Sequence, residues 1–130
     1  MQQDTMKVLL VEDSPVNQLV TSALLSDIGV EHTIVESGLL ALDILLKDEG
    51  HDIGLILMDC QMPELNGFKA TKLIRRGYAG ADHKLTPIVA LTGHSDEEDR
   101  MLCFEAGMNG FLSKPIDLAA LGSTIDRLMG

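Results

Sequence analysis

Five times along the chain, a short run of apolar residues gives way to a longer segment with helical spacing of its apolar positions. We predict strands at these runs, which are residues 7–11, 31–35, 53–58, 86–91 and 109–113. Helices are predicted after each strand, at about residues 15–28, 38–49, 65–76, 95–106 and 117–129. Repeated alternation of strands and helices is typical of a parallel sheet with right-handed crossovers. We therefore predict a doubly wound α/β domain.

The first, third and fourth apolar runs are almost uninterrupted. Such strands are typical of sheets that helices cover on both faces. The sequence contains no linker, repeat or low-complexity stretch, so we expect a single domain over residues 1–130, with its core at about 6–129. Only 16 residues follow Lys114, which is room for one helix, and no output domain is expected in this chain.

Residues that favour helix ends support these boundaries. Ser14 followed by Pro15 is typical of an N-cap and a first helical position, and Ser37 is a suitable N-cap for the second helix. Ser95 with Glu98 matches a capping box at the start of the fourth helix. Residues 77–84 are predicted to be an exposed connection. One apolar face is expected on the first helix, formed by Val16, Leu19, Val20, Ala23 and Leu24.

Composition and charge exclude several classes of protein. Hydrophobic residues make up 45% of the chain and charged residues 23%, as in an ordinary soluble globule. A formal net charge of -10 argues against general nucleic-acid binding, which needs a basic surface to replace phosphate counterions. No apolar run is long enough to cross a bilayer and no signal peptide precedes the first strand. We expect a cytoplasmic protein that does not insert into membranes.

Acidic residues follow two of the predicted strands. Asp59 comes directly after the run 53–58, and Glu12 and Asp13 come directly after the run 7–11. If these strands are neighbours, three carboxylates meet at one edge of the sheet, and each pair about 5 Å apart would repel by about 3 kcal/mol at an effective dielectric constant of about 20. Such a group implies a bound cation, a raised pKa, or both.

Two further polar residues fall at strand ends, Thr92 after the fourth strand and Lys114 after the fifth. Ligands of open α/β sheets bind at the carboxyl ends of the strands, where the strand order reverses. Carboxylates suit Mg²⁺, while a hydroxyl and an ammonium group suit phosphoryl oxygens. The set therefore indicates a phosphoryl site with a carboxylate nucleophile, a metal and a counter-cation.

Four stretches at these strand ends resemble the receiver domain of two-component response regulators, and they occur in the order and at the spacing of that family. They are VLLVEDSPVNQ, LILMDCQMPELNGF, PIVALTGH and AGMNGFLSKPI. The resemblance covers nearly all of the chain and implies a five-stranded parallel sheet of order 2-1-3-4-5. The PVNQ and SKPI segments are similar to receivers of hybrid histidine kinases and phosphorelays. This similarity implies a cytoplasmic receiver that either stands alone or is part of a larger, membrane-anchored kinase.

The resemblance implies a role for each acidic residue. Asp59 matches the phosphoacceptor, which takes a phosphoryl group from a phosphohistidine of a histidine kinase or a histidine phosphotransfer protein. Asp13 and Asp59 match direct ligands of Mg²⁺, for which Mn²⁺ can substitute, and Glu12 matches an acid that acts through water. The backbone carbonyl of Gln61 matches the remaining protein ligand. Gln61 and His94 border the site and are expected to tune the hydrolysis of the acyl phosphate.

The resemblance also implies a switch. Lys114 matches the lysine that pairs with the phosphoryl group, and its bond to Pro115 is cis in the family. Thr92 matches the hydroxyl that moves toward the phosphate, and Phe111 matches the aromatic residue that turns inward behind it. These movements would change the surface formed by the fourth helix, the fifth strand and the fifth helix, where a downstream protein can bind. The protein would then be a signalling phosphoacceptor that promotes only its own phosphorylation and dephosphorylation.

Three other functions are compatible with parts of this pattern. A haloacid-dehalogenase-type phosphatase also uses an aspartate nucleophile at a strand end, but it places a second acid where this chain has Gln61. A flavodoxin-like flavin carrier would need a less acidic first loop than Glu12-Asp13-Ser14-Pro15, and aromatic residues make up only 3% of the chain. A pseudo-receiver that binds a partner without phosphorylation is the remaining alternative.

Overall fold

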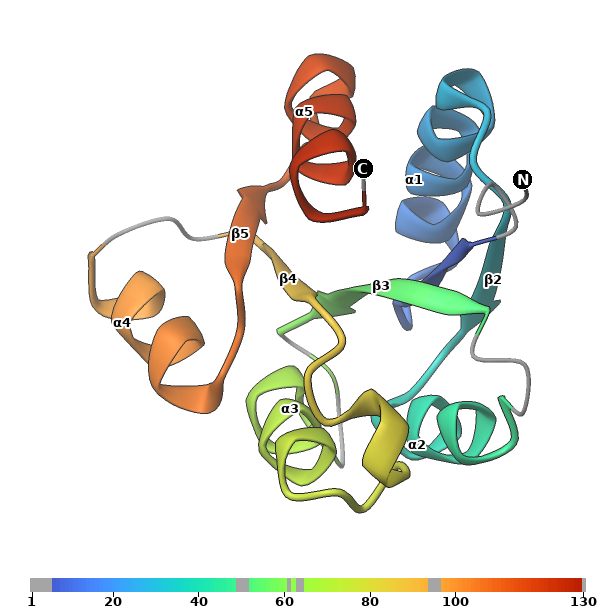
Figure 1. Cartoon of the computed structure of the whole chain (residues 1–130). Helices are drawn as coiled ribbons and strands as arrows, with labels where there is room; N and C mark the ends of the chain where they lie inside the picture. Colours follow the sequence, from blue (N-terminus) through green and yellow to red (C-terminus); the bar gives the residue numbers. More distant parts are fainter. Residues whose placement is uncertain (1–5, 49–51, 61, 63–64, 94–96, 130) are drawn as a thin grey trace.

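Five parallel strands form a single sheet in the computed structural model, which describes residues 6–48, 52–60, 62, 65–93 and 97–129 (Figure 1). The order across the sheet is β2-β1-β3-β4-β5, and every neighbouring pair is parallel, which confirms the predicted fold. The strands are β1 (Lys7–Val11), β2 (His32–Val35), β3 (Ile53–Asp59), β4 (Ile88–Thr92) and β5 (Gly110–Ser113).

Helices cover both faces of this sheet (Figure 1). They are α1 (Pro15–Ile28), α2 (Gly38–Leu46), α3 (Gly67–Arg75), α4 (Glu97–Ala106) and α5 (Leu118–Met129), with a short 3-10 helix η2 (Ala81–His83) before β4. One apolar cluster joins the sheet to α1 and α5, and the other joins it to α2, α3 and α4. Among the described residues, none of these helices combines the length and apolarity needed to cross a membrane.

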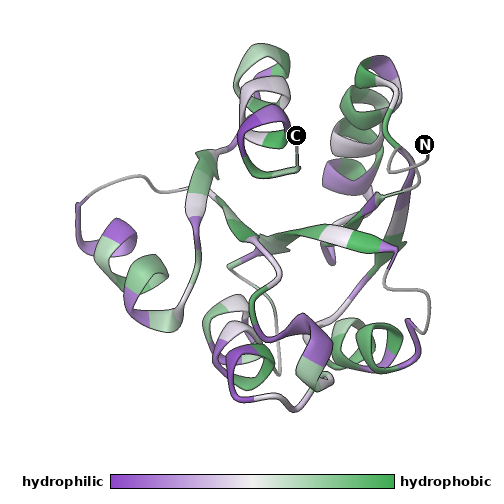
Figure 2. Ribbon diagram, viewed as in Figure 1, coloured by the Kyte–Doolittle hydropathy of each residue, from purple (hydrophilic) through white to green (hydrophobic). Residues whose placement is uncertain are grey.

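The strands form the centre of the core, where hydrophobic residues predominate (Figure 2). All seven residues of β3 are buried, including Asp59, and four of the five residues of β1 are buried. Burying a Val, Leu, Ile or Met side chain contributes about 1.5–3 kcal/mol to the free energy of folding. The central strands β1 and β3 are therefore held firmly, and the loops that leave their carboxyl ends start from fixed points.

Side-chain caps begin the first three helices. Ser14 Oγ accepts a hydrogen bond from the backbone N–H of Asn17, and Ser37 Oγ accepts one from Leu40, as predicted. The third helix begins at Gly67 rather than at 65, because Asn66 Oδ1 accepts a hydrogen bond from the backbone N–H of Lys69 and acts as its N-cap. The predicted cap of the fourth helix, Ser95, lies outside the described residues.

The predicted apolar face of α1 is wrong in its orientation. Leu19 is 73% exposed, and Val16 and Val20 are also exposed, whereas the helix buries Thr21 and Leu25 against the sheet. Only Leu24 of the predicted face packs partly against the core. The helix is turned so that a row of apolar side chains faces outward beside the carboxyl end of β1.

The connection between α3 and β4 is also less exposed than predicted, because His83 is buried in it. His83 Nδ1 lies 2.8 Å from Thr86 Oγ1, and Nε2 lies 3.0 Å from Asp48 Oδ2. The Asp48 carboxylate also accepts hydrogen bonds of 3.1 Å from the backbone N–H groups of Asp52 and Ile53. This network ties the segment before β4 to the end of α2 and the start of β3.

Replacing Asp48 by Asn should destabilise the protein by about 1–3 kcal/mol near neutral pH, because buried donors lose a charged acceptor. Burial acts to raise the pKa of Asp48, but the hydrogen bonds from Ile53, Asp52 and His83 outweigh it and hold the pKa below its ordinary value of 3.8. The carboxylate therefore stabilises the fold above pH 3.8, and this contribution is lost as the pH falls through the lowered value. Urea unfolding of both proteins from pH 7 to pH 3 measures the difference.

The exposed Asp43, which pairs with Lys47 at 3.0 Å, offers a matched control. Its replacement by Asn should change stability by less than about 0.5 kcal/mol. A difference between the wild type and the Asp48 variant that stays constant over this pH range would contradict the assigned role of the carboxylate charge.

Candidate functional site

Three carboxylates meet at the carboxyl ends of β1 and β3. The two strands are neighbours, with Val11 paired to Met58, so the residues that follow them leave the sheet side by side. One carboxylate oxygen from each of Glu12, Asp13 and Asp59 lies within 4.8 Å of the other two. The convergence predicted from the sequence is therefore present.

Burial strengthens the repulsion between these carboxylates. Glu12 is 0% exposed and Asp59 is 2% exposed, whereas Asp13 is partly exposed. Two charges at this separation repel by about 3 kcal/mol at an effective dielectric constant of about 20, and water screens buried charges poorly. The fold therefore needs cations at this place if all three groups are ionised.

Lys114 supplies one positive charge. Its Nζ donates a hydrogen bond of 3.2 Å to Asp59 Oδ1 and also lies 3.2 Å from Glu12 Oε1. Burial acts to lower the pKa of Lys114, but the charges of Asp59 and Glu12 outweigh it, so the pKa is raised and the ammonium group stays protonated. One lysine balances only one of three carboxylates, and the remaining charge matches a divalent cation.

The oxygen atoms of this cluster are suitable ligands for such a cation. Glu12 Oε1 is buried and, among the described residues, has no partner in hydrogen-bond geometry, although Lys114 lies within ion-pair distance. Asp13 faces the same space with a partly exposed carboxylate. Hard oxygen ligands with an accessible side are the set that Mg²⁺ prefers, since this ion keeps several of its waters. The residues present therefore fit a hydrated Mg²⁺.

Backbone contacts hold the loop that carries Glu12 and Asp13. Gln18 Nε2 donates a 2.7 Å hydrogen bond to the carbonyl oxygen of Glu12, and the backbone N–H of Ser14 donates one of 3.2 Å to Glu12 Oε2. Sequence reasoning missed Gln18. Its position on the second turn of a predicted helix gave no signal, because the contact depends on how α1 folds back over the end of β1.

The ends of β4 and β5 bring Thr92 and Lys114 to the same edge. The backbone N–H of Lys114 donates a 2.8 Å hydrogen bond to the carbonyl oxygen of Thr92, and the Lys114–Pro115 peptide bond is cis. Thr92 is buried. Phe111 packs partly against the core, and the guanidinium carbon of Arg100 lies 4.8 Å from its ring centroid. Arg100, on α4, is a contact that the sequence did not reveal.

Gly67 brings the start of α3 against the acidic cluster. A Cβ atom at this position would collide with the carbonyl oxygen of Asp59 and lie 3.0 Å from Cys60 Cα. Only glycine permits such a close approach of two backbones. The predicted site residues Gln61 and His94 lie outside the described residues.

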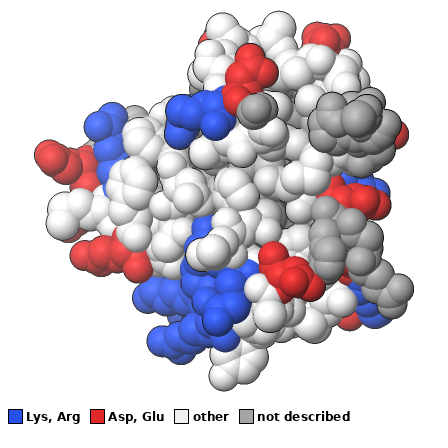
Figure 3. Space-filling view, viewed as in Figure 1, with Lys and Arg blue, Asp and Glu red and all other residues white. Residues whose placement is uncertain are grey.

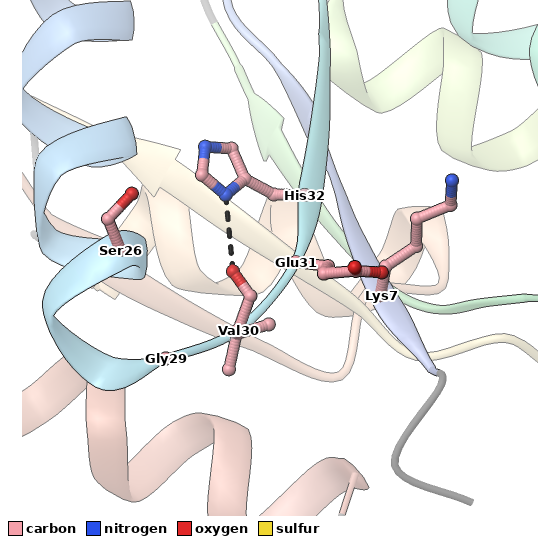
Figure 4. Close-up of a pocket in the computed structure, with 6 residues that line it drawn as sticks. All are labelled: Lys7, Ser26, Gly29, Val30, Glu31 and His32. Atoms are coloured by element: carbon pink, nitrogen blue, oxygen red, sulfur yellow. Dashed lines mark hydrogen bonds between the residues drawn. The ribbon is translucent and has the colours of Figure 1, made fainter. Parts of the chain in front are cut away.

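A separate hollow lies at the amino ends of β1 and β2, the opposite edge of the sheet (Figure 4). His32 contributes to its wall, but its ring already has partners, with Nε2 2.7 Å from Ser22 Oγ and Nδ1 3.3 Å from the carbonyl oxygen of Val30. In the described part of the chain, the acidic trio lies at the other edge, so we assign no chemistry to this hollow.

Comparison with known proteins gives a consistent result. The family model described as response regulator receiver domain matches residues 8–126. The chain is 43% identical to the osmosensing histidine protein kinase SLN1 of Saccharomyces cerevisiae, over 86% of this chain and 9% of that protein. It is 37% identical to Histidine kinase 1 of Arabidopsis thaliana, over 92% of this chain and 12% of that protein. The chain thus spans about a tenth of the length of these curated relatives.

Solved structures show the same likeness. The receiver domain of the sensor histidine kinase PA1611 from Pseudomonas aeruginosa, with a magnesium ion coordinated in its active-site cleft, is 39% identical with a TM-score of 0.84, covering 96% of this chain and 98% of that one. The receiver domain of Ssk1 from Saccharomyces cerevisiae, in complex with the histidine phosphotransfer protein Ypd1, is 30% identical with a TM-score of 0.81, covering 95% and 88%.

Proposed function

Because the chain belongs to the response regulator receiver family, we propose that Asp59 accepts a phosphoryl group from a phosphohistidine in a reaction that requires Mg²⁺. The observation that supports this most is the meeting of Glu12, Asp13, Asp59 and Lys114 at one edge of the sheet. The family match gives no support to a haloacid-dehalogenase-type phosphatase or a flavin carrier. The single domain would occupy residues 1–130, and the relatives indicate a receiver of the hybrid-kinase or phosphorelay type.

The metal would be held by Asp13 and Asp59 directly, by Glu12 through water and by the backbone carbonyl of Gln61. Mg²⁺ supplies positive charge that offsets the negative charge spread over the transferring phosphoryl group. Mn²⁺ also prefers oxygen ligands and can substitute. The fully buried Glu12 and the hydrogen bond from Gln18 keep this loop in place, so the ligands need little rearrangement.

Asp59 acts as the nucleophile. A carboxylate oxygen forms a bond to phosphorus while the bond from phosphorus to the imidazole nitrogen of the donor breaks, and the electron pair of that bond stays on the imidazole. Lys114, already hydrogen-bonded to Asp59 Oδ1, holds the carboxylate in position and then pairs with the phosphoryl oxygens. In this proposal the protein promotes only its own phosphorylation, by dephosphorylating the donor, and its own dephosphorylation.

The new phosphate would act as a switch through Thr92 and Phe111. A phosphoryl group adds up to two negative charges and new acceptors, which the Thr92 hydroxyl can reach from the neighbouring strand. Phe111 would then turn into the space that Thr92 leaves, and its contact with Arg100 would be lost. That movement couples the site to the surface of α4, β5 and α5, where we propose that a downstream protein binds.

Incubation with acetyl phosphate and Mg²⁺, followed by intact mass measurement, tests the proposed function. We expect a gain of one phosphate per chain, loss of this gain with a chelator, and its return with Mg²⁺ or Mn²⁺. A chain that gains no phosphate would be a pseudo-receiver. A phosphate on His or Ser would also contradict the proposal.

We further propose that the phosphohistidine-bearing partner docks on the outward apolar row of α1, formed by Val16, Leu19 and Val20. A groove beside this row is lined by residues of α1 and of the loop after β5, including Val20, Lys114 and Pro115. Exposed apolar side chains beside the proposed phosphoacceptor site are typical of a protein-binding surface. The complex of the Ssk1 receiver with Ypd1 supports a phosphotransfer protein as this partner.

Replacing Leu19 by Glu should slow phosphotransfer at least about tenfold, because a buried charge replaces an apolar contact in the interface. Phosphorylation by acetyl phosphate should stay the same. The rates are measured with a histidine phosphotransfer protein that phosphorylates the wild-type chain. Leu46→Glu on α2, also exposed, is the control and should leave both rates unchanged. Equal slowing by the two variants would argue against docking on α1.

A further inference from the structure

Helix α3 and the segment after it form the most basic part of an otherwise acidic protein. Residues 65–85 contain five of the ten Lys and Arg residues and one of the twenty Asp and Glu residues. The remaining chain therefore carries 19 acidic and five basic residues. Figure 3 shows basic side chains gathered on the lower part of the molecule, where Figure 1 places α3.

Four of these cations are exposed and lie on one continuous surface. Lys69, Lys72 and Arg76 are spaced at i, i+3 and i+7, so they share one side of α3 over about 10 Å. Lys84 adjoins them, because Arg75 Nη1 donates a 2.9 Å hydrogen bond to its carbonyl oxygen and its side chain lies over Gly77. We call these four residues the α3 basic surface.

Local stabilisation does not account for this surface. Among the described residues, no carboxylate pairs with any of the four side chains, in contrast to Lys47 and Lys114. Cations near the carboxyl end of a helix interact well with the helix dipole, which explains Lys72 and Arg76. Lys69 lies in the first turn, where the same dipole disfavours a positive charge. The helix dipole therefore gives no reason for a positive charge at Lys69.

The surface also presents apolar side chains on a rigid support. Tyr78 is 63% exposed and Leu85 is 89% exposed, and both belong to the segment that carries Lys84. Arg75 fixes this segment through hydrogen bonds to the carbonyl oxygens of Lys84 and Thr86, and His83 anchors it to Asp48. A partner would therefore bind a preformed surface and lose little entropy in ordering it.

We propose that the α3 basic surface docks an acidic amphipathic helix of a partner protein. Glutamates one and two turns apart on such a helix match the spacing of Lys69, Lys72 and Arg76, and an apolar residue between them would meet Tyr78 or Leu85. A nucleic acid or an anionic membrane would extend past these four cations and meet the strongly acidic remainder of the chain. A short acidic helix avoids that repulsion.

This surface is distinct from the proposed phosphodonor surface. Helices α1 and α3 pack on opposite faces of the sheet, as the two core clusters and Figure 1 show. An acidic helix on α3 and a phosphotransfer protein on α1 would therefore bind at the same time. The proposal does not depend on phosphorylation, and it is tested with the unphosphorylated chain.

The probe is a 16-residue helical peptide with glutamates at i, i+3 and i+7 and one leucine on the same side. We expect it to bind the full chain, with chemical-shift changes confined to residues 67–86 and an affinity that falls as salt is raised. The variant K69E/K72E/R76E should bind at least about tenfold more weakly, and the neutral variant K69Q/K72Q/R76Q should be intermediate. The control K47E/R127E reverses two exposed charges, one just after α2 and one on α5, and should bind within about twofold of wild type.

Three outcomes would overturn the proposal. The first is unchanged peptide binding by the charge-reversed variant, with its fold verified by circular dichroism. The second is equal or tighter binding of duplex DNA or phosphatidylserine vesicles to the same residues, which would assign the surface to a different class of ligand. The third is a wild-type dimer in sedimentation that the charge-reversed variant loses, which would make a second copy of this chain the occupant.

Discussion

Replacing Asp59 by Asn should abolish phosphorylation by acetyl phosphate and by a phosphotransfer protein. An amide oxygen is a far weaker nucleophile than a carboxylate, so no acyl phosphate forms and the rate should fall by more than about a thousandfold. The side chain keeps its shape and an oxygen that can accept the hydrogen bond from Lys114, so the variant should fold. Intact mass after incubation with Mg²⁺ and acetyl phosphate measures the effect.

The same variant should bind Mg²⁺ at least about tenfold more weakly, because one of the three carboxylates of the cluster is lost. Titration calorimetry measures this affinity without any phosphodonor. Asp126→Asn on the outer side of α5 is a suitable control and should match the wild type in both experiments. Undiminished phosphate uptake by the Asp59 variant would mean that another residue is the acceptor.

The sheet and its acidic edge could be predicted from the sequence because both depend on local patterns. A buried strand has a recognisable apolar run, and the residues after it must lie at the carboxyl edge of a parallel sheet. Because β1 and β3 are neighbours, the residues at their carboxyl ends, Glu12, Asp13 and Asp59, lie close together. The convergence of the carboxylates therefore followed from the strand ends, whereas the role of each residue was implied by the resemblance to receivers.

Contacts between distant elements could not be predicted in this way. The apolar row of α1 has the spacing of a core face, and only the packing of the helix shows that Leu19 points outward. The pairing of His83 with Asp48 and the stacking of Arg100 on Phe111 join segments whose relative position no local pattern specifies. An exposed apolar row on a helix has the same spacing as a core face, so the hydrophobic periodicity alone assigns it to the core. Such rows are typical of surfaces that bind partners.

Replacing Gly67 by Ala should damage both the fold and the site. The new methyl group would collide with the carbonyl oxygen of Asp59 and press on Cys60 Cα and Met58 Cγ, each at 3.0 Å. Two of these atoms belong to the backbone at the end of β3, which is fully buried and cannot yield easily. The amino end of α3 and the end of β3 must therefore both shift apart, at a cost of about 1–3 kcal/mol. Urea unfolding measures this loss.

The shift at the end of β3 would also displace Asp59 from Lys114, since the new methyl group collides with the backbone of Asp59 itself. A displacement of about 1 Å from productive geometry can cost about a hundredfold in rate, so phosphorylation of the Gly67 variant should slow by that order even where it remains folded. Gly122→Ala in α5 is the matched control, because its nearest neighbour, Ile28 Cδ1, is 4.0 Å away. Alanine there should leave the phosphorylation rate unchanged and stabilise the helix by about 0.5–1 kcal/mol. If the two variants behaved alike, the close contact between α3 and β3 could not be what holds Asp59 in place.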